Sequence, residues 1–199
     1  GGAGGRGGAE ARIPILMPVC GRPHYLRQVL TALSQVKGID KSVLVVSQDG
    51  HDPQVSAFVA GIGFTEVVVL RHTRPFLGVF AWFWDSLHAA SANIRFLLDF
   101  AFDGLGAGHA IVLEDDIVPS PDFLRFFAWG CRHILKDERV LSVTGFNLHS
   151  RVSPEQGFDP RDHPHDMVEN RDGGRASFTG WSWAISAGTW RKVRNEWSE

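Results

Sequence analysis

The stretch HAIVLEDD, residues 109–116, decides the fold that we expect, because an apolar run of strand length ends there in three consecutive carboxylates. A short uninterrupted apolar run is typical of a strand that is buried on both faces, as in parallel sheets covered by helices. The carboxylates of Glu114, Asp115 and Asp116 repel one another and are costly to remove from water, so a positive charge should lie close to them.

Runs of the same kind recur along the chain and alternate with amphipathic segments. Further strands are predicted at residues 13–19, 42–47, 66–70 and 140–144. Helices are predicted at 22–37, after the capping pair Asp52-Pro53, at 79–100, and after Ser120-Pro121-Asp122. This alternation indicates an α/β domain with a mainly parallel central sheet flanked by helices, and such sheets bind ligands beyond the carboxyl ends of their strands.

The two ends of the chain differ from this middle part. Residues 1–11 are rich in glycine and are expected to form a flexible linker, which leaves 12–199 as the folded domain. Residues 149–176 are polar and interrupted by prolines, so we expect a long irregular loop there. Order should return with an aromatic strand at 177–186 and a last helix that carries tryptophans.

The composition narrows the class of protein. The 199 residues are 44% hydrophobic and 21% charged, which is the balance of one globular domain. Lys and Arg number 20 against 22 Asp and Glu, and this net charge of −2 argues against binding nucleic acid through bulk positive charge. Two cysteines, Cys20 and Cys131, are too few for a disulfide framework. No apolar run approaches the roughly 20 residues of a membrane span, and because the chain does not begin with Met, we expect a piece of a longer protein.

The acidic triplet is the strongest candidate for chemistry. Hard cations such as Mg²⁺ and Mn²⁺ take oxygen ligands and bridge to the phosphates of a substrate. The triplet also follows a strand at the edge where an α/β sheet binds its ligand. The alternative interpretation is a solvated turn that happens to be acidic.

Two other candidates follow predicted strands. Asp49, within Ser47-Gln48-Asp49-Gly50, either accepts a hydrogen bond from a base or ribose or belongs to a plain Asp-Gly turn. Arg22 precedes a helix N-terminus, where backbone N–H groups favour anions, so it is either a pyrophosphate ligand or a surface side chain. The turn that contains Arg22 has neither a G-x-G-x-x-G nor a P-loop motif.

The remaining motifs are weaker. His163 and His165, flanked by aspartates, could bind zinc or iron, but in a polar loop solvated histidines are favoured. The aromatic segment 178–183 either stacks on a sugar ring or packs in the core. Because aromatic and small residues alternate in that segment, we do not expect Trp181 and Trp183 to share one environment. No G-x-S-x-G motif supports an α/β-hydrolase.

Taken in order, these residues resemble a known family. The elements that carry the resemblance are Cys20 and Arg22, Ser47-Gln48-Asp49, Glu114-Asp115-Asp116, Pro121-Asp122-Phe123, and Phe178-Thr179-Gly180-Trp181-Ser182-Trp183 ahead of Trp190. Their order and spacing resemble glycosyltransferase family 13, which includes the alpha-1,3-mannosyl-glycoprotein and protein O-mannose N-acetylglucosaminyltransferases. The resemblance covers most of residues 13–197.

The resemblance implies a GT-A fold and an inverting, Mn²⁺-dependent transfer of N-acetylglucosamine from UDP-GlcNAc to a mannose-type acceptor on a glycan or glycoprotein. Carried over by position, Asp116 would bind the metal directly, and Glu114 and Asp115 would hold the donor's sugar and ribose. Asp49 would recognise the uracil, and Arg22 would lie beside the nucleotide. The full-length protein would be a type II membrane protein of the Golgi lumen.

The chain departs from the family pattern in several places. Gly21 stands where the family has Asp, and Asp85 or its neighbours fall where the family has a His near the base. The loop after Asn147 differs in composition, which bears on the acceptor. The family's general base is an Asp in a Trp-Asp-rich motif that would begin just after Glu199, so we expect the catalytic base beyond that residue.

Two rival hypotheses remain open. Another GT-A enzyme with a different nucleotide-sugar donor would share the acidic motif. A non-catalytic sugar-binding domain would keep the aromatic segment and tolerate loss of the carboxylates. A nucleotidyltransferase is less favoured, because its Gly-rich phosphate loop should follow the first strand, and the Gly tract here precedes it.

Overall fold

The computed structural model of this chain describes residues 12–73, 82–146 and 180–197. Several predictions lie outside the described residues: the flexible linker at 1–11, the irregular loop at 149–176 with its His163/His165 motif, and the first residues, 177–179, of the aromatic strand.

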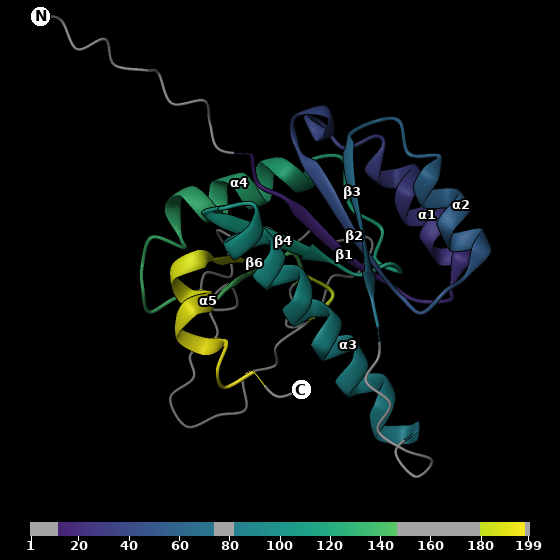
Figure 1. The fold of residues 1–199 in the computed structure, drawn as a ribbon. Helices are drawn as coiled ribbons and strands as arrows, with labels where there is room; N and C mark the ends of the chain where they lie inside the picture. Colours follow the sequence, from purple (N-terminus) through teal and green to yellow (C-terminus); the bar gives the residue numbers. More distant parts are fainter. Residues whose placement is uncertain (1–11, 74–81, 147–179, 198–199) are drawn as a thin grey trace, which may run out of the picture.

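A six-stranded sheet forms the centre of the described part, in the order β3-β2-β1-β4-β6-β5 (Figure 1). Its strands are β1 (Ile15–Val19), β2 (Val43–Asp49), β3 (Glu66–His72), β4 (His109–Leu113), β5 (Val143–Thr144) and β6 (Ser182–Ser186). The first four strands pair in parallel, which confirms the prediction of a mainly parallel sheet. β6 is antiparallel to β4 and to β5, so β6 begins at the edge where β1 to β4 end.

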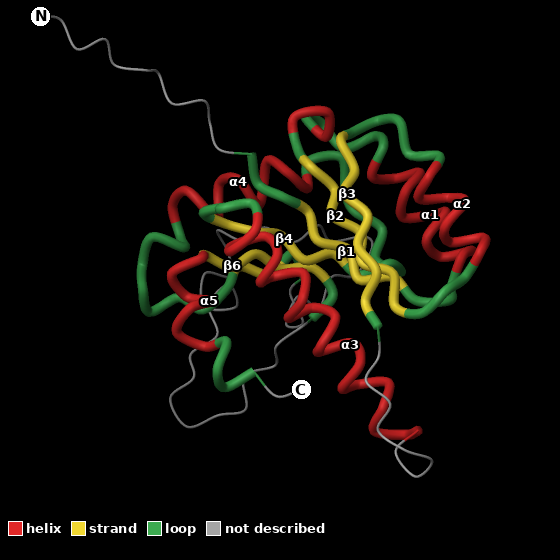
Figure 2. Tube along the Cα trace, in the orientation of Figure 1, coloured by secondary structure: helices red, strands yellow, loops and turns green. Residues whose placement is uncertain are grey.

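Helices cover both faces of the sheet, because successive strand residues point to opposite sides. In β1, Ile15 and Met17 face one hydrophobic core and Leu16 faces the other. The first core lies under α1 (Pro23–Leu33), α2 (Pro53–Ala60) and α4 (Phe123–His133). The second lies under α3 (Trp82–Asp99), the π-helical turn η2 (Phe100–Gly104) and α5 (Ala187–Val193). Figure 2 shows the strands as a layer between helices. A 3₁₀ turn, η1 (Ile39–Lys41), leads from α1 into β2.

The two predicted helix caps had different outcomes. Asp52 caps α2 as predicted, since its Oδ1 accepts hydrogen bonds from the backbone N–H of Gln54 at 2.8 Å and of Val55 at 3.1 Å. The side-chain cap predicted at Ser120-Pro121-Asp122 is wrong, because no side chain there accepts a hydrogen bond from the first turn of α4. Asp122 occupies the N-cap position of α4 but makes no side-chain cap, because its Oδ1 accepts the hydroxyl of Ser120 at 2.7 Å instead.

Several predicted elements are shorter than expected. The helix predicted at 22–37 ends at Leu33, and the strand predicted at 177–186 begins at Ser182. The predicted strand at 140–144 is reduced to Val143–Thr144, because the N–H of Val140 donates to the carbonyl of Asp137 and so belongs to a turn. The last helix ends at Val193, and Trp197 lies beyond it, although the Trp197 ring still contacts Trp190 at a centroid distance of 5.4 Å. None of the described helices combines the length and the apolar character needed to cross a bilayer.

Candidate functional site

The carboxyl ends of β1, β2, β3 and β4 lie at one edge of the sheet, because these strands run in the same direction. This edge collects the polar residues that the sequence singled out, since Arg22, Asp49 and the acidic triplet each follow or end one of these strands. The start of β6 reaches the same edge, where the N–H of Glu114 donates to the carbonyl of Trp181 at 3.0 Å. Residues from widely separated parts of the chain therefore form one site.

Arg22 binds two of the three carboxylates. Its Nη2 lies 2.5 Å from Asp115 Oδ1 and its Nη1 lies 2.7 Å from Asp116 Oδ2. Desolvation lowers the pKa of Arg22, but the charges of Asp115 and Asp116 outweigh it and raise the pKa overall. Within the described structure, Arg22 supplies the positive charge that the triplet requires.

Asp115 is the buried member of the triplet, with a side chain that is 2% exposed. Its Oδ1 accepts Arg22 and its Oδ2 accepts the backbone N–H of Cys20 at 3.2 Å. Burial raises the pKa of Asp115 above its ordinary value, while the hydrogen bond from Cys20 and the charge of Arg22 act in the opposite direction. Asp115 therefore ties the turn after β1 to the end of β4.

Asp116 is different, because only one of its oxygens is engaged. The side chain is 29% exposed, Oδ2 accepts Arg22, and Oδ1 is buried with no hydrogen-bond partner in the part of the chain that the structure describes. A buried carboxylate oxygen without a partner is unfavourable unless a cation or donor reaches it. The oxygen chemistry and the negative charge of Asp116 fit a hard divalent cation.

Glu114 is the member of the triplet that lies next to the aromatic segment, since its N–H donates to the carbonyl of Trp181. Burial raises its pKa, and the negative charges of Asp116 and Asp115 raise it further. A Cβ added to Gly180 would lie 3.5 Å from Glu114 Oε1, so the backbone at Gly180 passes close to this carboxylate. Across residues 12–73, 82–146 and 180–197, no three His, Cys, Asp or Glu side chains converge into a metal-binding cluster.

Asp49 ends β2 at the same edge, beside a histidine that the sequence analysis missed. His72 ends β3 opposite Asp49, and its Nδ1 lies 3.6 Å from Asp49 Oδ1. The predicted strand stopped at Leu70, so His72 fell outside the strand end. Gln48 has a structural role, because its side chain donates to the carbonyl of Asp52 and accepts the hydroxyl of Ser56. Gly50 has φ +78°, as the turn interpretation requires.

The two tryptophans of the aromatic segment differ in environment, because Trp181 lies in the turn before β6 and Trp183 lies within the strand. Trp183 is 1% exposed and packs in the second core, whereas Trp181 is 40% exposed. Phe146, which the sequence analysis did not single out, contacts Trp181 at a ring-centroid distance of 4.6 Å. Phe146 follows β5 at the same edge, so its place after a strand was the signal that could have identified it.

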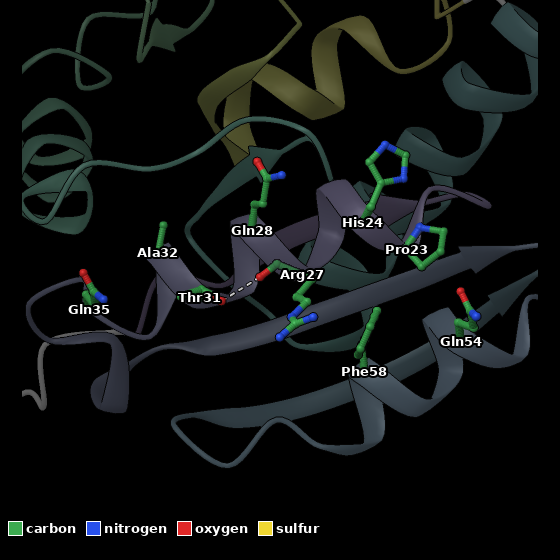
Figure 3. A pocket seen from close by; sticks show the side chains of 9 residues that line it. All are labelled: Pro23, His24, Arg27, Gln28, Thr31, Ala32, Gln35, Gln54 and Phe58. Atoms are coloured by element: carbon green, nitrogen blue, oxygen red, sulfur yellow. Dashed lines mark hydrogen bonds between the residues drawn. The ribbon is translucent and has the colours of Figure 1, made fainter.

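A broad open hollow of about 850 Å³ lies elsewhere, along the outer sides of α1 and α2 (Figure 3). His24, Arg27 and Gln28 of α1 and Gln54 and Phe58 of α2 are among its lining residues. The hollow includes none of the three carboxylates. We place the candidate site at the sheet edge, because the charged and buried polar groups are there.

Both cysteines are thiols in the structure, so no disulfide joins Cys20 to Cys131. Cys20 is exposed beside the site, while Cys131 is buried in α4. Burial raises the pKa of Cys131 to about 11.

Comparison with known proteins identifies relatives over the whole described region. The model of the GNT-I family matches residues 5–199. The alpha-1,3-mannosyl-glycoprotein 2-beta-N-acetylglucosaminyltransferase of Arabidopsis thaliana is 22% identical over 196 residues, which are 96% of this chain and 41% of that protein. An alpha-1,6-mannosyl-glycoprotein 2-beta-N-acetylglucosaminyltransferase of the same plant is 37% identical over 59 residues, 30% of this chain and 14% of that protein. The chain thus spans less than half the length of these curated relatives.

Solved structures share the fold. Mannosyltransferase PcManGT from Pyrobaculum calidifontis, determined with GDP-Man and Mn²⁺, has a TM-score of 0.55 at 14% identity and is matched over 92% of this chain and 46% of that one. The glycosyltransferase GlyE of Streptococcus pneumoniae has a TM-score of 0.50 at 10% identity, over 94% of this chain and 37% of that one. At identities this low, the comparison shows a shared fold and nothing about function. The fold is the GT-A type that the sequence predicted.

Proposed function

The chain belongs to the GNT-I family, and from this premise we propose that the full-length protein is an inverting, metal-dependent glycosyltransferase. The proposed donor is UDP-GlcNAc, and the proposed acceptor is a mannose-type hydroxyl of a glycan or glycoprotein. The names of the two Arabidopsis relatives support the transfer of N-acetylglucosamine to mannosyl glycoproteins. The presence of Mn²⁺ in the PcManGT structure is a property of that protein and makes Mn²⁺ the first cation to test.

The proposal rests on one observation, which is the environment of the Asp116 carboxylate just after β4. Its Oδ1 is buried without a partner in the described structure, next to a guanidinium and two further carboxylates. Mg²⁺-like cations are commonly held by one or two carboxylates together with substrate phosphates, so they do not need a cluster of three protein ligands. Asp116 is therefore the residue that would hold the cation. When bound, the cation would act as a Lewis acid toward the leaving diphosphate.

The other residues of the edge would bind and orient the donor. Arg22 is 44% exposed and carries the positive charge nearest to the triplet, so we assign it to the diphosphate. Asp115 has both oxygens engaged, and we propose that it acts on the donor by holding Arg22. Glu114 would accept hydroxyls of the donor sugar. Asp49, beside His72, would accept from the base.

Inversion in a single displacement also requires a base that removes the proton of the acceptor hydroxyl on the face opposite the leaving group. We propose that this base lies beyond Glu199, as the family resemblance implies. By the same resemblance, we infer that the full-length protein resides in the Golgi lumen behind an N-terminal anchor. Imaging of a tagged full-length protein against a Golgi marker tests this localisation.

The proposal can be tested by measuring UDP binding with and without Mn²⁺ by isothermal titration calorimetry. We expect Mn²⁺ to strengthen UDP binding by roughly tenfold or more, because the cation offsets the charge that the diphosphate brings to an acidic edge. Asp116→Asn should remove this metal dependence. The matched control is Asp103→Asn. Asp103 is an exposed acid of η2 that pairs with Arg194, so this change should leave the metal effect unchanged.

Two results would contradict the proposal. One is UDP affinity that is the same in Mn²⁺ and in EDTA. The other is an Asp116→Asn protein that keeps the full metal effect. With the full-length enzyme, a panel of UDP-GlcNAc, other UDP-sugars and GDP-mannose then identifies the donor, and transfer from GDP-mannose alone would refute the assignment to UDP-GlcNAc.

A further inference from the structure

Helix α4 carries large aromatic side chains on its solvent-facing side. Trp129 is 53% exposed and Phe126 is 36% exposed, whereas Phe127 and Cys131 of the same helix are buried in the first core. The Trp129 ring contacts the His133 ring at a centroid distance of 5.7 Å. Single exposed apolar side chains are common on protein surfaces, but aromatic ones that gather on one face with polar neighbours mark an interaction site.

Basic side chains surround these rings. Arg125 and Arg132 are exposed and lie four residues before and three residues after Trp129, a spacing that brings side chains together on a helix. Lys136 is exposed in the turn that follows the helix, and the helix itself contains no Asp or Glu. We define the outer face of α4 as Arg125, Phe126, Trp129, Arg132 and Lys136.

The carboxylates at the two ends of α4 do not cancel this positive charge. Each has a basic partner, and the pairs are Asp122 with Arg125 at 3.7 Å, Asp137 with Arg139 at 2.7 Å, and Glu138 with Lys192 at 2.7 Å. Of these pairs, only the first uses a cation of the outer face, and exposed pairs of this length contribute little. The outer face therefore keeps a net positive charge and attracts anionic groups.

The direction and the size of this face favour a membrane over a protein partner. The opposite side of α4 packs on the first core, so the outer face points away from the sheet (Figure 1). The 11 residues of α4 form a cylinder about 17 Å long and about 10 Å wide, which offers roughly 170 Å² on one side. A stable protein interface buries about 800 Å² on each partner. A lipid surface has no such minimum, because aromatic rings enter the headgroup layer and cations pair with phosphates.

We propose that the outer face of α4 docks the protein on a membrane surface that contains anionic phospholipids. The indole of Trp129 would lie at the level of the headgroups, as Trp does at membrane–water interfaces, and the basic side chains would pair with lipid phosphates. Contact of this kind is peripheral and leaves the sheet edge in water, where a soluble ligand can reach it. This goes beyond the proposed function, since no residue of the candidate site takes part.

The test is flotation of the whole chain with vesicles of phosphatidylcholine, alone or with about 30% phosphatidylserine. We expect binding to the anionic vesicles that weakens as NaCl is raised from about 0.1 M to about 1 M, because salt screens the attraction. Each basic residue near an anionic surface contributes roughly fivefold, so Arg132→Gln/Lys136→Gln should reduce the partition coefficient by roughly 25-fold. Trp129→Ala should reduce it by roughly tenfold.

Two matched controls lie elsewhere on the protein. Trp181→Ala removes a tryptophan that is 40% exposed at the sheet edge. Arg71→Gln removes an exposed charge on β3, which lies at the opposite end of the sheet from β5. Both controls should bind the anionic vesicles within about twofold of the unaltered protein. Circular dichroism and thermal melts show whether each variant is folded, and all of the replaced side chains are exposed.

The inference is overturned if the chain does not float with the anionic vesicles, or if the outer-face variants float as the unaltered protein does. Equal losses in the two controls would also overturn it, because the attraction would then belong to the whole surface. Light scattering during size-exclusion chromatography tests a second copy of the chain as the occupant. A dimer that Trp129→Ala abolishes, without vesicle binding, would assign α4 to a protein interface instead. Nucleotide binding plays no part in these measurements, so they are separate from the test of the proposed function.

Discussion

Replacing Arg22 by Ala should destabilise the protein at neutral pH, and the loss should disappear in acid. The change removes the guanidinium that binds Asp115 at 2.5 Å and Asp116 at 2.7 Å. Asp116 is 29% exposed and can recover water, so its loss is small. Asp115 is 2% exposed and would retain only the hydrogen bond from Cys20 among the contacts described above.

The magnitude follows from this difference in burial. Breaking a fully buried ion pair by removing one partner costs about 3–5 kcal/mol, and one hydrogen bond to a charged group contributes roughly 1.5–3 kcal/mol. Since Arg22 itself is 44% exposed, water screens part of the ion pair. The smaller of these two energies, that of one hydrogen bond to a charged group, therefore applies. We therefore expect the free energy of unfolding to fall by about 2–3 kcal/mol at pH 7.5.

The sign of the pH dependence follows from Asp115. Its pKa is already raised by burial, and removing Arg22 should raise it further. A carboxyl with a raised pKa keeps its proton in the folded protein at a pH where the unfolded chain has released it, so the folded state loses stability as the pH rises through that window. Below the ordinary Asp pKa of 3.8, Asp115 is neutral in both states and the penalty of the substitution should vanish.

Urea denaturation at pH 7.5 and at pH 3 measures this effect, with Arg22→Ala/Asp115→Asn as the rescue variant. Asn keeps the size of Asp without its charge, so the double variant should recover most of the stability at pH 7.5. The control is Arg139→Ala, because Arg139 pairs with an exposed aspartate, Asp137, and should matter much less. The reasoning is refuted if Arg22→Ala is equally destabilised at both pH values, or if the second substitution restores nothing.

Three further predictions concern the rest of the fold. Iodoacetamide should alkylate exposed Cys20 and spare Cys131 in the native protein, since burial raises the pKa of Cys131 to about 11. Mass spectrometry of the labelled protein identifies which cysteine carries the added group. Gly130→Ala should lower the unfolding free energy by about 1–2 kcal/mol despite its better helix propensity, because the new Cβ would lie 2.9 Å from Val143; a stabilised variant would contradict this. Burial lowers the pKa of His109, so the unfolded chain binds that proton first and stability falls as the pH drops below 6.5; His109→Gln should flatten this slope in thermal melts between pH 7 and pH 5.

Much of the fold follows from local sequence patterns. The strand His109–Leu113 has the bounds predicted from its apolar run, and Asp52 caps α2 as predicted from its place before Pro53. These features depend on residues that are close together in the chain, so the sequence alone determines them.

The site could be predicted only in outline. Apolar runs and helices predicted a parallel sheet, and the carboxyl ends of parallel strands share an edge, so the sequence indicated where Arg22, Asp49 and the triplet would gather. It did not indicate which side chains would pair. Arg22 reaches carboxylates 93 and 94 residues away in the chain, and Phe146 meets Trp181 across two strands.

The sequence by itself determined that three carboxylates would end a buried strand and would need a compensating charge. Only the tertiary structure decided that Arg22 would neutralise Asp115 and leave one oxygen of Asp116 without a partner in the described part of the chain. The physical reason is that hydrophobic periodicity specifies which face of an element is buried, whereas strand order and register decide which distant groups meet in the low dielectric of the interior.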